Sequence, residues 1–360
     1  MKAVVTGIAG FIGSNLASRL LKEHWHVIGI DNLSRRGSEL NLRWLRDQSP
    51  NIDFVNADVR SCQQMDEILS RLPDTDALIH EAAQVAVTTS VADPRRDFET
   101  NALGTFNVLE AVRRYCPEAA FVYASTNKVY GGLDHVGVVE MPTRYSYADR
   151  PDGIAETEPL DFHSPYGCSK GSADQYVRDY GRIYGLRTTV VRQSCIYGPR
   201  QFGVEDQGWV AWFSIAAVFG LPVNIFGDGK QVRDILWVDD LIDLYFAIIS
   251  NPGVASGKIF NAGGGPINTL SLLELIELLR ERGYQLRHSF ADWRPGDQKV
   301  FIADSGLARR ELGWAPRVTP SQGVSHLLAW VEASSDEIRR FLEFPTANGE
   351  FPTVSEEVNA

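Results

Sequence analysis

The chain has 360 residues, of which 44% are hydrophobic and 22% charged, a composition typical of a folded globular protein and not of a disordered chain. Its formal net charge of -11 argues against nucleic acid or an anionic membrane as the main partner and favours a small metabolite. Four cysteines without a C-x-x-C pair, no apolar run long enough to span a bilayer and no signal-peptide cleavage pattern predict a cytoplasmic protein with reduced thiols and no metal site.

The N-terminus contains the pattern expected of a dinucleotide-binding turn. A short apolar strand, Lys2 to Thr6, leads into Gly7, Gly10 and Gly13, and a helix-compatible segment follows from Ser14 to Lys22. Glycines allow the backbone to approach a pyrophosphate, whose charge is stabilised by free N–H groups at the start of a helix. The alternative is an ordinary turn between a strand and a helix.

The second predicted strand favours the dinucleotide interpretation. It runs from His26 to Ile30 and ends at Asp31, where a carboxylate can accept hydrogen bonds from an adenosine ribose. A carboxylate there repels a 2'-phosphate, which favours NAD over NADP. Arg35 and Arg36 lie close by and leave NADP open as an alternative.

Further strand-like runs alternate with helical patterns and predict an α/β fold, a Rossmann-type doubly wound parallel sheet with helices on both sides. After Ser194 the pattern becomes irregular, as expected of a smaller C-terminal substrate-binding lobe. We expect a Rossmann domain over 1–194 with a return contribution near 232–262, a substrate lobe over 195–231 and 263–343, and a tail over 344–360. The remaining predicted strands are Ile52–Asn56, Ala77–His80, Ala120–Ala124 and Thr188–Arg192.

Three side chains in the middle of the chain suit proton transfer. Tyr166 and Lys170 are spaced to project from one face of a helix, and an ammonium group beside a phenol lowers the phenol's pKa. Such a tyrosine can take a proton from an alcohol while a hydride leaves the same carbon. Thr126 follows a predicted strand and can donate to the substrate oxygen. Taken singly, the tyrosine and lysine also suit an exposed helix face, and the threonine suits a loop cap.

Together these motifs resemble the extended short-chain dehydrogenase/reductase family, the NAD-dependent epimerases and dehydratases of nucleotide sugars. The likeness covers nearly the whole chain, in the segments TGIAGFIG, DNLSR, HEAAQVAV, NALGTFNVLEA, STNKVYG, YGCSK, YGPRQF, GDGKQVRD and RPGDQ. It implies NAD as the cofactor and a nucleotide sugar, most specifically a CDP-sugar, as the partner. It also implies a homodimer or homotetramer, formed by four-helix packing of the Asn101 and Tyr166 helices.

The resemblance assigns residues to the cofactor and to catalysis. Thr126, Tyr166 and Lys170 would form the catalytic set, and Tyr166 and Lys170 would also contact NAD. The remaining cofactor contacts would be Gly7, Gly10, Phe11, Ile12 and Gly13 at the pyrophosphate turn, Asp31, Asn32, Ser34 and Arg35 at the adenosine ribose, Asp58 and Val59 at the adenine, and Ala82, Ala83, Gln84 and Asn101 in the inner pocket.

The resemblance also implies a substrate site, with two departures from the family pattern. Its members would be Thr126, Asn127, Cys195, Gln207, Gly208, Gln231, Arg233, Arg294 and Asp297. The two arginines would hold the diphosphate, and their alternative is a solvated surface pair. Cys195 replaces an asparagine common in relatives. Asn127 and Lys128 stand where dehydratases of the family carry Asp-Glu.

Without those two carboxylates a 4,6-dehydratase would lack its acid and base, so the resemblance favours an epimerase, an isomerase without net redox change. The finest likeness implies inversion of C2 of CDP-paratose to CDP-tyvelose through a 2-keto intermediate, in bacterial surface polysaccharide synthesis. The alternatives are a CDP-glucose 2-epimerase, a UDP-glucose 4-epimerase and a non-catalytic NAD-binding sensor.

Overall fold

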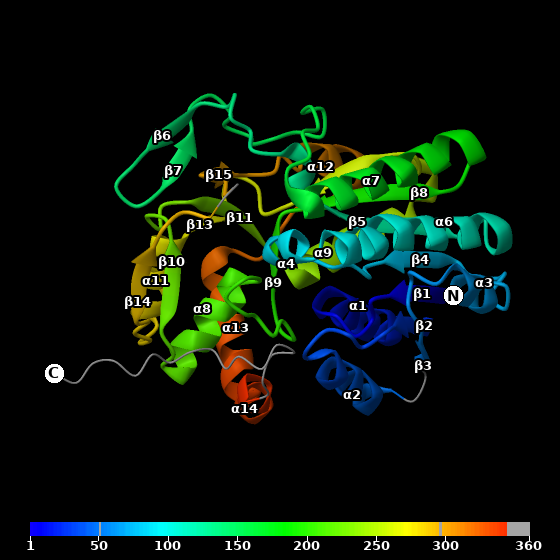
Figure 1. Cartoon of the computed structure of the whole chain (residues 1–360), viewed down its shortest axis with the longest axis horizontal. Helices are drawn as coiled ribbons and strands as arrows, with labels where there is room; N and C mark the ends of the chain where they lie inside the picture. The colour runs from blue at the N-terminus through cyan, green and yellow to red at the C-terminus, as the bar shows by residue number, and fades with distance from the viewer. Residues whose placement is uncertain (50–51, 295–296, 344–360) are drawn as a thin grey trace.

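The fold is built on one central parallel sheet, which confirms the predicted architecture (Figure 1). The computed structural model describes residues 1–49, 52–294 and 297–343, so the predicted tail over 344–360 lies outside the described residues. The seven strands, from one edge to the other, are β12 (Ile259–Ala262), β8 (Thr188–Gln193), β5 (Ala120–Thr126), β4 (Ala77–His80), β1 (Lys2–Thr6), β2 (His26–Asp31) and β3 (Ile52–Asn56).

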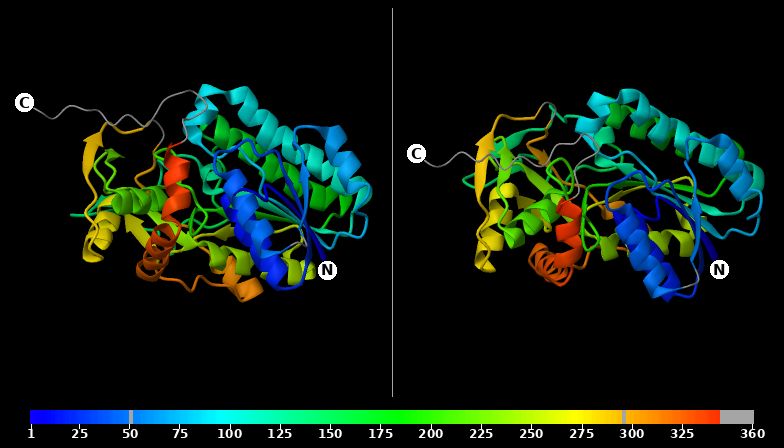
Figure 2. Two further views of the ribbon diagram at one scale, coloured as in Figure 1. Left: turned by 90° about the horizontal axis from the view of Figure 1, so that it is seen from below. Right: turned by 60° about the horizontal axis from the view of Figure 1, so that its bottom comes forward.

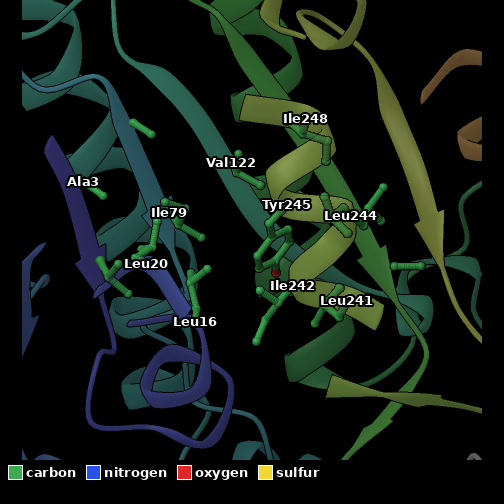
Figure 3. Close-up of a cluster of buried hydrophobic side chains, with 14 of the residues drawn as sticks. Ala3, Leu16, Leu20, Ile79, Val122, Leu241, Ile242, Leu244, Tyr245 and Ile248 are labelled. Carbon is green, nitrogen blue, oxygen red and sulfur yellow. The ribbon is translucent and has the colours of Figure 1, made fainter. Parts of the chain in front are cut away.

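Helices cover both faces of this sheet, as continuous apolar strands require. One face carries α1 (Phe11–Lys22), α2 (Ser38–Gln48), α9 (Val238–Ser250), α10 (Pro252–Ala255) and α12 (Gly306–Leu312). The other carries α3 (Cys62–Leu69), α6 (Gly104–Tyr115) and α7 (Ser164–Tyr184), and Figure 2 shows α6 and α7 side by side. Leu16, Leu20, Leu241 and Tyr245 interlock against the sheet on the first face (Figure 3).

Short helical segments follow the strands β4 and β5 in the chain. They are α4 (Val87–Ala92), α5 (Pro94–Phe98), the π-helix η1 (Glu99–Leu103) and the 3-10 turn η2 (Asn127–Tyr130). The π-helical turn η1 continues directly into α6, and it contains Asn101. The turn η2 starts immediately after β5, so Thr126 is the last residue of a strand and not, as expected, part of the following loop.

A smaller group of elements lies to the left in Figure 1, beyond the carboxyl ends of the strands. Its strands are β9 (Cys195–Tyr197), β10 (Val223–Phe226), β11 (Val232–Trp237), β13 (Thr269–Ser271), β14 (His288–Ala291) and β15 (Val300–Phe301), with the hairpin β6 (Val138–Glu140) and β7 (Tyr145–Tyr147) nearby. Its helices are α8 (Trp209–Phe219), α11 (Leu272–Glu281), α13 (Pro320–Ala333) and α14 (Ser335–Glu343). The domain boundaries given above stay a prediction.

Trp209 and Trp212 pack against the apolar core of this smaller group and are partly buried there. None of the helices in the described ranges is both long and apolar enough to cross a membrane.

A buried ion pair fastens α7 to the sheet. Arg192 on β8 donates to both carboxylate oxygens of Asp174 on α7, at 2.9 and 3.0 Å, and the two side chains are 2% and 0% exposed. Ser125 on β5 donates to the same carboxylate at 2.7 Å. The pair therefore joins the helix that carries Tyr166 to the strand that carries Thr126.

Replacing Asp174 by Asn is expected to lower the free energy of unfolding by about 3–5 kcal/mol, because it leaves the Arg192 guanidinium buried without a counter-charge. Urea denaturation of the NAD-loaded protein measures the change. Glu118→Gln is the matched control, because Glu118 pairs with Arg187 at the surface and its side chain is 82% exposed. Equal stability of the two variants would contradict this role of the buried pair.

Candidate functional site

The glycine turn after β1 has the close backbone packing that a dinucleotide site requires. Gly7 has a φ of +72°, and a Cβ there would lie 2.7 Å from the amide nitrogen of Ala82. A Cβ at Gly13 would lie 2.1 Å from the carbonyl oxygen of Gly7. The helix α1 begins at Phe11 with no side-chain cap and no acidic residue in its first turn. Its free N–H groups therefore suit an anion such as a pyrophosphate, so the turn fits NAD.

Asp31, at the end of β2, is held by the same turn. Its carboxylate accepts hydrogen bonds from the backbone N–H of Ala9 at 3.0 Å and of Leu33 at 2.8 Å. Burial raises the pKa of this carboxyl, and the backbone hydrogen bonds oppose that shift. The side chain is thereby oriented beside the glycine turn, where the prediction places the adenosine ribose.

The predicted adenine end borders a cavity of about 470 Å³, whose lining residues are Asp58, Arg60, Ser61, Gln64, Glu99 and Leu103. Asn32 donates to Asp58 at 2.9 Å. Burial acts to raise the pKa of Asp58, but hydrogen bonds from Arg60 outweigh it and lower the pKa to about 2. Val59 is buried against Gly104 at the start of α6. Ser34 is exposed, on the loop between Asn32 and α2.

The residues predicted for the inner cofactor pocket join the segment after β4 to η1 and α7 by hydrogen bonds. Asn101 accepts from the backbone N–H of Gln84 at 2.8 Å and donates to the Gln84 carbonyl at 2.9 Å. It also donates to Ser169 on α7 at 3.1 Å. Ala82 and Ala83 follow β4 on the same segment and are partly buried. Sequence reasoning missed Asp97, which accepts hydrogen bonds from Gln84, Asn101 and Ser169 at once.

The predicted catalytic residues come together at the carboxyl end of β5. Tyr166 is 9% exposed and Lys170 only 3%. Burial raises the pKa of Tyr166 to about 12, and a hydrogen bond with Thr126 acts in the opposite direction. Thr126 therefore touches the phenol, as the prediction of a Thr-Tyr-Lys set requires.

The side chain of Lys170 is held by the backbone, and the expected lowering of the Tyr166 pKa by Lys170 stays a prediction. The ammonium group of Lys170 donates to the carbonyl of Ala124 and lies 4.4 Å from the centre of the Tyr123 ring. Burial lowers the pKa of Lys170 to about 8, although nearby Glu81, Asp174 and Asp97 act to raise it. The lysine is thus satisfied by the backbone and by an aromatic face, and the group that acts to lower the Tyr166 pKa is Thr126.

Several predicted substrate residues meet beside η2. Arg233 on β11 donates to Asp297 at 2.6 Å, and its side chain is 11% exposed. Cys195 on β9 is partly buried next to Arg233, and burial raises the pKa of its thiol. Asn127 is buried and accepts from the Thr126 hydroxyl at 3.4 Å. Arg233 is thus largely buried, which does not fit a solvated surface position.

The other substrate residues lie around this group. Arg294 pairs with Asp206 at 3.1 Å and lies 3.8 Å from the centre of the Phe226 ring. Gln231 is buried and donates to the Phe226 carbonyl at 2.6 Å. Gln207 accepts a hydrogen bond from Arg35, so the predicted cofactor and substrate sets touch there. Gly208 caps α8 with a φ of +75°.

Two further polar residues of the site were not among those predicted. Lys128 donates to Gln298 at 3.3 Å beside Arg233, and its place in the segment STNKVYG was the signal that pointed to it. Glu81 follows β4 and accepts a hydrogen bond from Tyr245 on α9. No group of histidine, cysteine or acidic side chains in the described ranges could hold a metal ion.

Comparison with known proteins relates this site to one family. The model of the NAD dependent epimerase/dehydratase family matches residues 3–263. The chain is 45% identical over 340 residues to a CDP-paratose 2-epimerase of Salmonella typhi, covering 92% of this chain and 100% of that protein.

Two solved structures are similar over nearly their whole length. A UDP-glucose 4-epimerase of Thermotoga maritima with UDP-glucose has a TM-score of 0.80 at 32% identity, covering 93% of this chain and 100% of that one. A UDP-glucuronic acid 4-epimerase of Bacillus cereus, in complex with UDP-glucuronic acid and NAD, has a TM-score of 0.79 at 28% identity, covering 92% and 99%.

Glu81 should make the stability of this site depend on pH. Burial raises its pKa to about 7. The unfolded chain releases this proton near its ordinary pKa of 4.5, so the folded state binds more protons between pH 4.5 and 7 and loses stability as the pH rises. Glu81→Gln should therefore gain thermal stability over the natural protein as the pH increases from 5 to 7, on the order of 2 kcal/mol.

Thermal melts of both NAD-loaded proteins across that range test the prediction, with the exposed Glu118→Gln as control. A constant difference between Glu81→Gln and the natural protein at every pH would contradict it.

Proposed function

The chain belongs to the NAD dependent epimerase/dehydratase family, and we propose that it inverts C2 of CDP-paratose to give CDP-tyvelose through a transient 2-keto sugar. It is an NAD-dependent nucleotide-sugar epimerase, an isomerase. The main support for CDP-paratose as the substrate is the 45% identity to a CDP-paratose 2-epimerase, which extends along the entire length of that relative.

The residues of the site support the following roles. NAD, held at the glycine turn and by Tyr166 and Lys170, would supply a reversible hydride acceptor. The 2-keto sugar would turn its opposite face to the cofactor before the hydride returns, and this inverts C2. Tyr166 takes the proton of the C2 hydroxyl group and later gives it back. Thr126 binds the phenol of Tyr166 and holds the reacting oxygen beside it. Lys170, protonated below a pKa of about 8, supplies positive charge in a buried site where a developing alkoxide needs it.

Other activities have less support. A dehydratase needs an acid and a base at the positions of Asn127 and Lys128, and neither side chain here is a carboxylate. A CDP-glucose 2-epimerase or a UDP-glucose 4-epimerase uses the same three groups on another sugar, so substrate choice separates these alternatives from the proposal. A non-catalytic sensor needs no buried Thr-Tyr-Lys set.

Proton NMR of CDP-paratose with the NAD-loaded protein in heavy water tests the function. We expect conversion to the C2-inverted sugar without deuterium at C2, because the hydrogen that leaves the carbon is not exchanged with solvent. Deuterium at C2 would overturn this mechanism in favour of proton exchange. If CDP-glucose or a UDP-sugar is converted and CDP-paratose is not, the substrate assignment is wrong.

Tyr166→Phe is the matched variant for the same assay. It keeps the buried ring and removes the hydroxyl, so conversion should fall by about 10²–10⁴-fold while the bound NAD is retained. Unchanged conversion would eliminate Tyr166 as the proton-transfer group.

The proposed setting is the cytoplasm and the synthesis of bacterial surface polysaccharide. All four cysteines are free thiols, which suits a reducing compartment. The pathway is proposed from the product, since tyvelose bound to CDP is an activated sugar donor.

We also propose that the chain is a homodimer, or a dimer of dimers, formed through α5, η1, α6 and α7. This surface exposes large apolar side chains that a monomer would leave in water: Phe98 55%, Leu103 38%, Tyr176 51%, Ile183 67% and Tyr184 52%. Large apolar side chains exposed along neighbouring helices are typical of association sites.

Replacing Tyr176 by Glu is expected to convert the oligomer to a monomer, because a charge at the centre of an apolar interface loses its hydration. Light scattering coupled to size exclusion gives the mass. Ile267→Glu is the control, since Ile267 is 82% exposed on a different surface. A monomeric natural protein, or an unchanged mass for Tyr176→Glu, would contradict the proposed interface.

A further inference from the structure

Lys128 is placed to act on substrate. It is the second residue of η2, and its backbone N–H donates to Thr126 Oγ1 at 3.3 Å. Its carbonyl oxygen lies against Gly167, next to Tyr166 on α7. Its side chain extends in the direction of the substrate residues and donates to Gln298 at 3.3 Å. Lys128 thus connects the proposed catalytic group with the residues expected to hold the nucleotide diphosphate.

The immediate surroundings of Lys128 carry an excess of positive charge. The carboxylate of Asp297, whose charge acts on Lys128, is already engaged by Arg233 at 2.6 Å. The described ranges show no ion pair to Lys128, and its hydrogen-bond acceptor is the neutral amide of Gln298. Cys195 is also close, but burial raises the pKa of its thiol and keeps it uncharged. Two cations therefore share one carboxylate in a partly buried site.

Such a site suits an anion from the substrate. Burial, followed by the charge of Arg233, lowers the pKa of Lys128 to about 8, so the ammonium form still dominates at neutral pH. A bound phosphate oxygen would supply the counter-charge that the protein itself does not provide.

The C2 reaction would benefit from the positive charge of Lys128. In a nucleotide sugar, C1 carries the oxygen of the inner phosphate, and C2 is the carbon bonded to C1. Oxidation at C2 therefore develops negative charge on an oxygen close to the phosphate. Oxidation at C4 takes place across the ring, away from the phosphate. A 2-epimerase thus has a need, which a 4-epimerase does not share, for a cation beside Thr126 and Tyr166.

We propose that Lys128 is a catalytic residue that binds the inner phosphate of the CDP-sugar and offsets its repulsion of the charge that develops on the C2 oxygen. This inference rests on the proposed function and adds a residue to it. It also gives a reason for an ammonium group where a dehydratase needs a carboxylate: a carboxylate there would increase the repulsion.

Two substitutions separate charge from shape. Lys128→Met keeps most of the length of the side chain and removes the charge, whereas Lys128→Arg keeps the charge. With CDP-paratose, kcat of Lys128→Met should fall by about 100-fold. Lys128→Arg should restore kcat to within about ten-fold of the natural enzyme, and both variants should retain NAD. Lys299→Met is the control, because Lys299 is exposed and lies over the Tyr145 ring.

Two outcomes of this kinetic assay would overturn the proposal. One is a kcat for Lys128→Met within about two-fold of the natural value. The other is a loss in Lys128→Arg as large as in Lys128→Met, since a structural role depends on shape and a phosphate contact depends on charge.

Calorimetry with CDP distinguishes this proposal from the proposed function. CDP carries the same two phosphates without a sugar, so its binding is independent of which sugar is converted. Lys128→Met should bind CDP about ten-fold more weakly and Lys128→Arg about as well as the natural protein. Equal affinities would overturn the phosphate contact even if CDP-paratose is converted. If the natural enzyme converts no CDP-paratose but the affinities differ as expected, the phosphate contact stands and the C2 reaction fails.

Discussion

The position of α7 is the constraint on which the catalytic geometry depends. The pair between Asp174 and Arg192, with the hydrogen bond from Ser125, fixes one helix against two strands inside the protein. Tyr166 and Lys170 project from that helix, and Thr126 ends the strand that contains Ser125. Because the three elements share one buried carboxylate, the threonine and the tyrosine meet at the end of β5.

A second, separate network of hydrogen bonds connects the C-terminal helix to the cofactor side of the sheet. Arg200 is buried with a φ of +66°, and its guanidinium donates to both carboxylate oxygens of Glu337 on α14, at 2.6 and 2.9 Å. It also donates to Asn41 at 2.9 Å, and Asn41 donates to the carbonyl of Ala9 in the glycine turn at 3.1 Å. The last described helix is thus connected through two side chains to the turn that suits the pyrophosphate.

Local patterns in the sequence were sufficient for the features that depend on local chemistry. The glycine turn, Asp31 and the paired spacing of Tyr166 and Lys170 are each set within a short segment, and each was predicted. The hydrogen-bond partners were not, because they come from distant parts of the chain. Lys170 donates to the carbonyl of Ala124, 46 residues away in the sequence, and not to the phenol of Tyr166. Asn101 was expected on a helix, but tertiary packing against Gln84 and Ser169 accompanies a π-helical turn there.

Burial also shifts the pKa values of the two proposed catalytic groups on α7. It raises the pKa of Tyr166 to about 12 and lowers that of Lys170 to about 8, so both groups resist ionisation in the folded protein. A tyrosine with this pKa is a neutral phenol at pH 7, so it can take the substrate proton only after releasing its own, and positive charge nearby favours that phenolate. Lys170 supplies that charge from the cofactor side. A substrate whose phosphate lies beside the reacting carbon brings negative charge from the opposite side, and Lys128 is the cation that meets it there. The reacting carbon would then lie between two ammonium groups, one on α7 and one on η2, and C2, bonded to the carbon that carries the phosphate, is a position that needs both.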